Sequence, residues 1–260
     1  MTMLLHVDRI TRRFGGYAAL NDASCEVAEG LVHALIGPNG AGKTTLFNVI
    51  SGVLRPTSGR LRFQGVDYTG SRPDKVLTMG IARNFQHVRL VRGLSVLENV
   101  MIGAHARIGR GLLGNAAEFL GFAVAEKAAR EKAREMLDFV GMAGKAEMQP
   151  DNLTLVDQRR LEIARALVSD PRLLLLDEPA AGMNAAELNE LSALIRRTQV
   201  NGLTVLLVEH HMRLVMSVSD QITVLSAGTI IAGGPPQVIQ RDPTVIAAYL
   251  GNGDELALHS

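Results

Sequence analysis

The spacing of hydrophobic and polar residues changes along the chain, and each change predicts a different kind of element. Residues 1 to about 88 favour strands and turns, because 31–36 is a short apolar run and 60–64 alternates polar and apolar residues. From about 93 to 158 the spacing becomes helical. Apolar residues there recur at steps of three and four, which predicts one buried helix face: Ala128, Ala129, Ala133, Met136, Leu137 and Val140.

Breaker residues and a second change of spacing complete this outline. Glycines across 103–124 predict a loop-rich stretch before the helix, namely Gly103, Gly109, Gly111, Gly114 and Gly121. Residues 160–235 return to alternating strands and helices, which predicts a parallel sheet with crossover helices and fully apolar strands at 173–176 and 203–208. Pro171 is expected to close the helix before the first of these strands, and Pro235 to open a small helical cap. The pattern predicts an α/β fold.

Composition narrows the class of protein. The chain has 260 residues, 47% hydrophobic and 20% charged, as in a globular protein with a substantial core. A net charge of +1 gives no electrostatic reason to expect nucleic acid as a partner. The single cysteine, Cys25, cannot form an internal disulfide and fits a reducing cytoplasm. The first residues lack a secretory apolar core and no segment approaches about 18 consecutive apolar residues, so we expect any work at a membrane to go through partners.

A phosphate-binding motif, G-x-x-x-x-G-K-[ST], follows the apolar run at 31–36. Its glycines allow backbone N–H groups to surround phosphate oxygens at the start of a helix, which 46–50 can continue. Lys43 would reach the β- and γ-phosphates and the Thr44 hydroxyl would bind Mg²⁺. An ordinary glycine-rich turn would not require this strand–loop–helix context. The motif consists of Gly37, Pro38, Asn39, Gly40, Ala41, Gly42, Lys43 and Thr44.

Two carboxylates end the apolar strand at 173–176. A central strand places its last residues at the carboxyl edge of the sheet, beside the phosphate loop. Asp177 is then placed to hold Mg²⁺, and Glu178 to polarise an attacking water as general base. The alternative is that both residues only cap the next helix or begin a turn before Pro179.

A histidine follows the second apolar strand. His210, after Glu209, is placed to hydrogen-bond a γ-phosphate and orient the water. A structural role is the alternative, and the neighbouring His211 leaves open which imidazole faces the site.

These motifs, in this order, resemble the ATP-binding cassette family over nearly the whole chain. The resemblance implies a P-loop NTPase (RecA-like) core with an antiparallel β subdomain and an inserted α-helical subdomain. It implies one ATPase domain, 1–260, in which 1–92 and 159–235 form the nucleotide-binding core, 93–158 the helical subdomain with its glycine-rich insertion, and 236–260 a C-terminal cap. The implied reaction is hydrolysis of ATP to ADP and phosphate with Mg²⁺, coupled to transport across a membrane.

The resemblance also assigns roles to residues outside the motifs above. Gln86, in Arg83-Asn84-Phe85-Gln86, matches the family glutamine that senses nucleotide and contributes to the Mg²⁺ site and catalysis. Phe14 matches the aromatic residue that stacks on adenine, with Tyr17 in reserve and a plain core aromatic as the alternative. Thr45 joins the ATP ligands of the loop.

The chain looks most like the ATP-binding subunit of branched-chain amino acid importers. The segments that carry this likeness are 36–48, Ala181-Gly182-Met183-Asn184, 159–167, the insertion at 103–124 and the ending 245–251. The resemblance implies two transmembrane permease subunits, a second ATPase subunit and, indirectly, a solute-binding protein. It implies a peripheral location on the cytoplasmic face of the inner membrane. An exporter of lipid or polysaccharide, an ATPase acting on DNA or ribosomes, and a nucleotide switch are the alternatives.

One motif departs from the family pattern. The signature, usually Leu-Ser-Gly-Gly-Gln, here reads Leu153-Thr154-Leu155-Val156-Asp157. Thr154 keeps a hydroxyl for the γ-phosphate of the partner subunit's site, but Val156 replaces a glycine and Asp157 adds negative charge near an anionic ligand. Asn184 also stands where the wider family usually has aspartate. We therefore expect a heterodimer with unequal ATP sites.

Two surfaces are candidates for contact with the permeases. Arg83, Arg89 and Arg92 flank Gln86 and would dock a short helix of the permease, or else form a solvated basic face. Apolar residues of the insertion would touch the membrane subunits, or else pack within the helical subdomain: Leu112, Leu113, Phe119 and Phe122.

Overall fold

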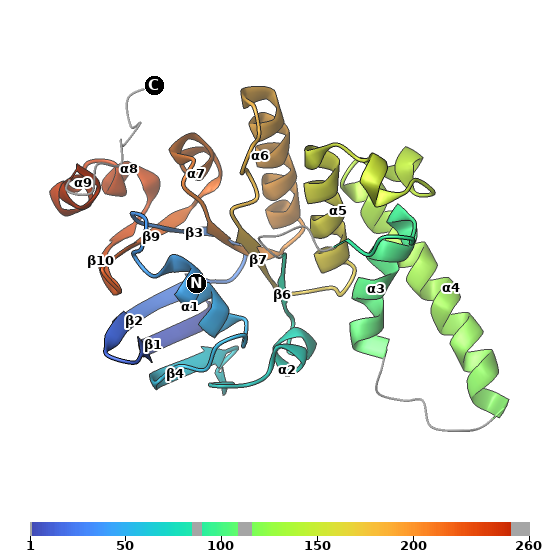
Figure 1. Ribbon diagram of the computed structural model, residues 1–260, viewed down its shortest axis with the longest axis horizontal. Coiled ribbons are helices and arrows are strands. Elements are labelled where there is room, and N and C mark those ends of the chain that lie inside the picture. Colours follow the sequence, from blue (N-terminus) through green and yellow to red (C-terminus); the bar gives the residue numbers. More distant parts are fainter. Residues whose placement is uncertain (1, 85–89, 109–115, 251–260) are drawn as a thin grey trace. The chain divides into compact units, whose positions relative to one another are not determined.

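The computed structural model describes residues 2–84, 90–108 and 116–250 (Figure 1). The chain divides into two compact units, one made of 1–79 with 175–260 and the other of 80–174. Each is described by itself. The predicted boundaries at 93 and 158 stay a prediction.

An antiparallel sheet with the order β2-β1-β4-β5 belongs to the first unit. Leu5, Val7 and Ile10 are buried, whereas His6 and Asp8 are partly exposed and Arg9 is exposed, as expected of a sheet with one covered face. The turn between the first two strands uses Gly15 at a φ of 59°, and Phe14 pairs with Tyr17 across it. The strands are β1 (Met3–Phe14), β2 (Tyr17–Ala28), β4 (Ser58–Phe63) and β5 (Val66–Asp67).

A second sheet has the order β10-β9-β3-β8-β7-β6. All residues of β3, β7 and β8 are buried, which explains why these strands read as continuous apolar runs. Strand β3 pairs in parallel with β8 and β9, but β10 is antiparallel to β9, so the all-parallel expectation is wrong at that edge. The strands are β3 (Val32–Ile36), β6 (Ile81–Arg83), β7 (Leu173–Asp177), β8 (Thr204–Val208), β9 (Gln221–Ser226) and β10 (Thr229–Gly234).

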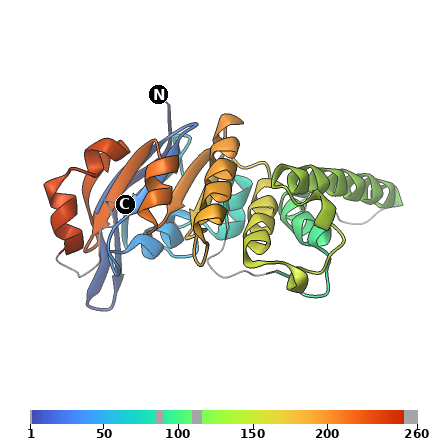
Figure 2. The same cartoon turned by 90° about the horizontal axis from the view of Figure 1, so that it is seen from above.

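The helices of the first unit cover the strands of this sheet that belong to the same unit. In Figure 1, α1 lies between the two sheets, and α6 and α7 lie on the other side of the larger one. Figure 2 shows the last two helices beside β9 and β10, and Ile239, Val245 and Tyr249 belong to the same buried hydrophobic cluster as Ile222 and Val224 of β9. The tail after Pro235 is thus helical as predicted, up to residue 250. The helices are α1 (Lys43–Ile50), α2 (Pro73–Thr78), α6 (Ala185–Val200), α7 (Met212–Val218), α8 (Pro236–Ile239) and α9 (Pro243–Leu250).

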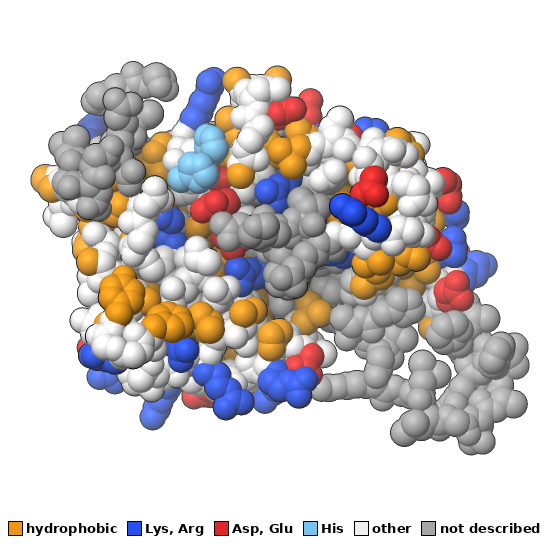
Figure 3. All heavy atoms as spheres, in the orientation of Figure 1, with side chains coloured by type: hydrophobic (Ala, Val, Ile, Leu, Met, Phe, Trp, Pro, Cys, Tyr) orange, Lys and Arg blue, Asp and Glu red, His pale blue; other side chains and the backbone are white. Residues whose placement is uncertain are grey.

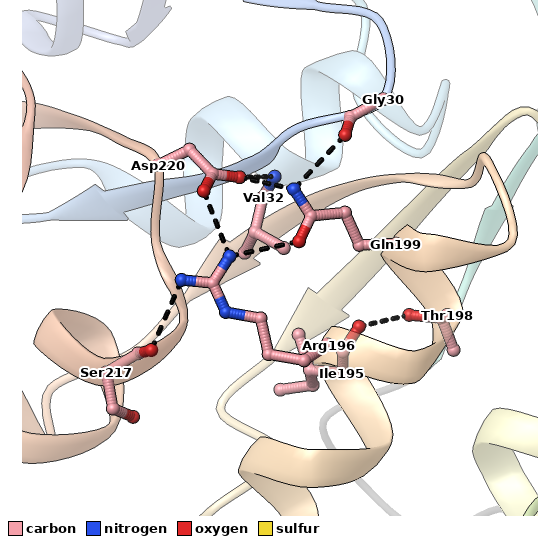
Figure 4. A network of polar contacts seen from close by, with 8 residues as sticks. All are labelled: Gly30, Val32, Ile195, Arg196, Thr198, Gln199, Ser217 and Asp220. Atoms are coloured by element: carbon pink, nitrogen blue, oxygen red, sulfur yellow. Dashed lines mark hydrogen bonds and ion pairs between the residues drawn. The ribbon is translucent and has the colours of Figure 1, made fainter.

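A polar network fixes the beginning of β3, at the end opposite to the phosphate loop (Figure 4). The Asp220 carboxylate accepts hydrogen bonds from the Val32 N–H at 2.8 Å, from Arg196 at 2.9 Å and from Gln199 at 2.6 Å. Gln199 also donates to the Gly30 carbonyl at 3.2 Å. The network therefore ties α6 and the start of β9 to the strand that leads into the phosphate loop.

The second unit is mainly helical. Its helices α3, α4 and α5 pack on one another. On α4 the buried face is Ala129, Ala133 and Leu137, whereas Ala128 is exposed, because it lies about 100° around the helix from its neighbour. The elements are α3 (Val96–Ile108), α4 (Ala116–Phe139), the short 3₁₀ helices η1 (Ala143–Lys145) and η2 (Pro150–Asn152), and α5 (Leu155–Leu167), which ends before Pro171 as predicted.

The prediction of a loop-rich stretch at 103–124 is mostly wrong. Gly103 lies inside α3 and Gly121 inside α4, while Gly109, Gly111 and Gly114 fall outside the described residues. A Cβ at Gly103 would stand 2.1 Å from the Arg165 carbonyl oxygen of α5. This glycine therefore serves the close approach of two helices and does not break one.

Candidate nucleotide site

The phosphate loop runs from the end of β3 to the start of α1, as predicted. Gly37, Gly40 and Gly42 have φ values of 152°, 76° and 105°, which side chains rarely tolerate. A Cβ at Gly37 would lie 1.9 Å from the Leu225 carbonyl oxygen, and one at Gly42 would lie 2.5 Å from that of Ala19. Neighbouring backbone thus excludes any side chain at these two positions.

The Lys43 side chain turns back into this loop. Its Nζ donates to the carbonyl oxygens of Gly37 at 2.6 Å and Pro38 at 3.0 Å, and the residue is only 8% exposed. No side chain caps α1 at Gly42, and the first turn holds no acidic residue. The first N–H groups of a helix have no acceptor within it, so this end, with a lysine beside it, is chemically suited to a polyphosphate.

A cavity of about 310 Å³ opens at the loop. Phe14 and Tyr17 both line it and are 46% and 63% exposed, so Phe14 is not a core aromatic. The Arg12 guanidinium lies 4.6 Å from the Phe14 ring centroid. Both aromatic side chains are therefore exposed at the cavity. The other lining residues are Ala19, Asn39, Gly40, Ala41, Gly42, Lys43, Thr44, Thr45 and Glu178.

The two carboxylates lie at the carboxyl end of β7. Asp177 is fully buried, whereas Glu178 is half-buried and lines the cavity. The next helix, α6, begins only at Ala185, where the Asn184 side chain accepts N–H bonds in a capping box with Glu187. The carboxylates therefore do not cap that helix, although the Glu178 carbonyl does accept a turn bond from the Ala181 N–H at 3.3 Å.

Glu178 has an unusual backbone conformation. Its φ is 46°, in the left-handed region, and Pro179 follows it. The Glu178 N–H donates to the Val208 carbonyl of β8 at 2.9 Å. Strain of this kind persists only where surrounding structure holds it, and it concentrates at functional sites.

Beyond β8, Glu209 is a site residue that sequence reasoning missed. Its side chain is fully buried, whereas the side chains of His210 and His211 are 52% and 32% exposed. The centroids of the two imidazole rings lie 4.4 Å apart, and histidine side chains are exposed on the face seen in Figure 3. His211 Nδ1 lies 3.2 Å from Glu209 Oε2, so His210 is the less engaged of the two rings. The only signal in the sequence was a carboxylate directly after an apolar strand.

Several predicted residues fall outside this description. Gln86 and Arg89 lie outside the described residues, as do Leu112 and Leu113. Phe119 and Phe122 lie in α4, but their side chains are not described. Arg83 is in β6. Arg92 forms an exposed ion pair with Asp151 at 3.7 Å.

The signature segment 153–157, which departs from the family pattern, lies at the start of α5. The Thr154 hydroxyl accepts from the Asp157 N–H at 3.2 Å and donates to the Asp157 carboxylate at 2.9 Å. Asp157 is buried, and its carboxylate binds Lys145 at 2.5 Å. Burial raises the pKa of Asp157, but the hydrogen bonds from Lys145 and Thr154 outweigh it and hold the pKa below its usual value. The expected negative charge is therefore compensated within the unit.

Oxygen ligands suited to Mg²⁺ are present in the first unit. The Thr44 hydroxyl is at the cavity, and the Asp177 carboxylate ends a strand at the same edge of the sheet as Glu178. Hydroxyl and carboxylate oxygens are ligands that Mg²⁺ prefers. No helix within the described residues has the length and apolar character needed to cross a membrane.

Known proteins resemble the chain over most of its length. Residues 20–181 match the family model described as ABC transporter, and 229–255 match the one described as branched-chain amino acid ATP-binding cassette transporter. The chain is 43% identical over 249 residues to the high-affinity branched-chain amino acid transport ATP-binding protein LivG of Salmonella typhimurium, with 95% of this chain and 98% of that protein covered. The corresponding protein BraF of Pseudomonas aeruginosa is 41% identical with the same coverage.

A solved structure is similar in the same way. It is the ADP conformation of MJ1267, an ATP-binding cassette of an ABC transporter. The TM-score is 0.83 at 29% sequence identity, with 96% of this chain and all of that chain covered.

Proposed function

The chain belongs to the ATP-binding cassette family of ABC transporters, and from this membership we propose that it binds and hydrolyses ATP in an importer of branched-chain amino acids or related small polar solutes. The observation that carries the proposal is the cavity at the phosphate loop, where Lys43, Thr44 and Glu178 meet. The names of the relatives support transport of branched-chain amino acids, and support neither a lipid or polysaccharide exporter nor a nucleotide switch.

ATP binding would use the loop and the aromatic residues beside it. Adenine stacks on Phe14 or Tyr17, while Lys43 and the first N–H groups of α1 hold the phosphates. Mg²⁺, when bound, neutralises charge that develops on the phosphate oxygens. Thr44 and Asp177 would hold it, with Gln86 as a further ligand.

Hydrolysis would use the carboxylate at the cavity. Glu178 polarises a water molecule and accepts its proton as the water oxygen bonds to the γ-phosphorus and the bond to the ADP oxygen breaks. His210 would hydrogen-bond the γ-phosphate, and its exposed ring leaves it available for that role.

The partners follow from the same proposal. The subunit would work at the cytoplasmic face of the inner membrane with two permeases, a second ATPase subunit and, indirectly, a solute-binding protein. The start of α5 supports a heterodimer with unequal sites, because the Thr154 hydroxyl is engaged with Asp157 and Val156 replaces a glycine. This chain would then offer its partner a weakened signature.

Purification from the native membrane in a gentle detergent tests the assembly. We expect two membrane subunits and a different ATPase to co-purify with the chain. Recovery of the chain without any membrane protein, from a preparation in which other transporters stay assembled, would overturn the transport role.

A further inference from the structure

Glu209 joins two segments of the site through one buried carboxylate. Its Oε1 accepts the Ala180 N–H at 2.9 Å. Its Oε2 accepts the backbone N–H groups of His210 at 2.8 Å and His211 at 3.0 Å, and lies 3.2 Å from the His211 ring Nδ1. The segment after the candidate base and the segment that carries the histidines therefore share this one side chain.

The segment 178–180 is held at both ends by consecutive residues of the β8 end. On one side, the Val208 carbonyl accepts the Glu178 N–H at 2.9 Å, and on the other, Glu209 accepts the Ala180 N–H. Between them, Glu178 has the left-handed φ of 46°. Such a conformation costs roughly 1–3 kcal/mol and requires neighbours that fix it.

We propose that Glu209 is a positioning residue for the hydrolysis, which holds Glu178 at the cavity and couples it to the histidine segment. This inference rests on the proposed function. Without the Ala180 contact, the strained backbone can relax and withdraw the Glu178 carboxylate from the reacting water. Nucleotide binding depends on the phosphate loop and not on this contact, so the effect should fall on kcat.

A carboxylate is the group this position requires. The backbone N–H groups of Ala180, His210 and His211 all point at its two oxygens, and a carboxylate accepts at both. A carboxamide would place an NH₂ group against N–H donors on one side. Glu209, His210 and His211 also place ligand atoms within 4.8 Å of one another, as a metal site would, but Oε2 already accepts these N–H groups.

The test is steady-state ATP hydrolysis by the complete transporter reconstituted in lipid, with Glu209→Gln compared with Asp220→Asn. Asp220 is a matched control, because its carboxylate also accepts a backbone N–H, from Val32 at 2.8 Å, but at the far end of β3. We expect Glu209→Gln to lower kcat at least ten-fold with KM for ATP changed less than three-fold. We expect Asp220→Asn to leave both within two-fold.

A double-mutant comparison separates positioning from general damage. If Glu209 acts through Glu178, then Glu209→Gln added to Glu178→Gln lowers the single-turnover rate less than two-fold further. The inference would be overturned if Glu209→Gln lowered the rate equally with Glu178 present and with Glu178→Gln. It would also be overturned if Glu209→Gln left kcat unchanged, or if Asp220→Asn lowered kcat as much as Glu209→Gln does. The proposed function fails separately, if Glu178→Gln alone keeps the wild-type kcat.

Discussion

Two glycines of the phosphate loop allow a prediction in which the structure sets the magnitude. Gly37→Ala and Gly40→Ala both place alanine at a positive φ, of 152° and 76° respectively, which costs about 1–3 kcal/mol at each position. They differ in space, because a Cβ at Gly37 would lie 1.9 Å from the Leu225 carbonyl oxygen, whereas a Cβ at Gly40 has no atom within 4 Å. Only the first substitution forces β9 away from the loop.

The steric difference should be about 3 kcal/mol, the upper part of the range for overpacked interiors. For a protein of this size that corresponds to a loss of roughly 6–12 °C in Tm for Gly37→Ala beyond the loss for Gly40→Ala. Scanning calorimetry of both variants measures it. Gly37→Ala should also lose nucleotide binding in equilibrium titrations. Two variants that melt within 2 °C of each other would refute the argument that backbone contact, and not φ alone, requires glycine at this position.

Three further predictions concern the site and its support. Glu178→Gln should lower kcat of the assembled transporter about 100-fold or more, as loss of a general base does. Thr154→Ala should cost about 1 kcal/mol of stability, because an N-cap is lost, and should change kcat less than three-fold. Equal losses of kcat in the two variants would refute unequal sites. Because the pKa of Asp157 is lowered in the folded state, its stabilisation is complete above the unfolded pKa of about 4 and is lost as pH falls through the lower folded value. The Tm difference between wild type and Lys145→Met should therefore shrink between pH 7 and pH 3, and a constant difference would contradict this assignment. Arg196→Ala removes a partly exposed ion pair and should cost about 1 kcal/mol by chemical unfolding with KM for ATP unchanged.

The elements that the sequence predicted well depend on local spacing. The phosphate loop and the strands at its sides could be predicted from the chain, because the loop motif is contiguous and because β3, β7 and β8, buried along their whole length, appear as continuous apolar runs. Gly103 was wrongly interpreted as a helix breaker, because the contact that requires glycine there is with the Arg165 carbonyl, which lies far along the chain in α5. Glycine as a breaker and glycine as a packing site look the same in one sequence.

The roles of charged residues were harder to predict from the sequence, for the same reason. Glu209 was missed because its acceptor role depends on Ala180, which another strand brings to it. Asp157 was expected to add charge against a ligand, but Lys145 pairs with it from η1. Whether a carboxylate faces a ligand or an internal cation follows from tertiary contacts that spacing alone does not reveal.

The most direct test of the central claim is uptake of radiolabelled leucine into proteoliposomes that hold the complete transporter. The solute-binding protein is added outside the vesicles, and Mg-ATP is enclosed on the side of the membrane where this subunit lies. We predict that uptake requires ATP, and that Glu178→Gln abolishes it while the complex still assembles and binds ATP. Undiminished uptake with Glu178→Gln would contradict hydrolysis at this site as the source of energy, and ATP hydrolysis without uptake of any branched-chain amino acid would contradict branched-chain amino acids as the transported solute.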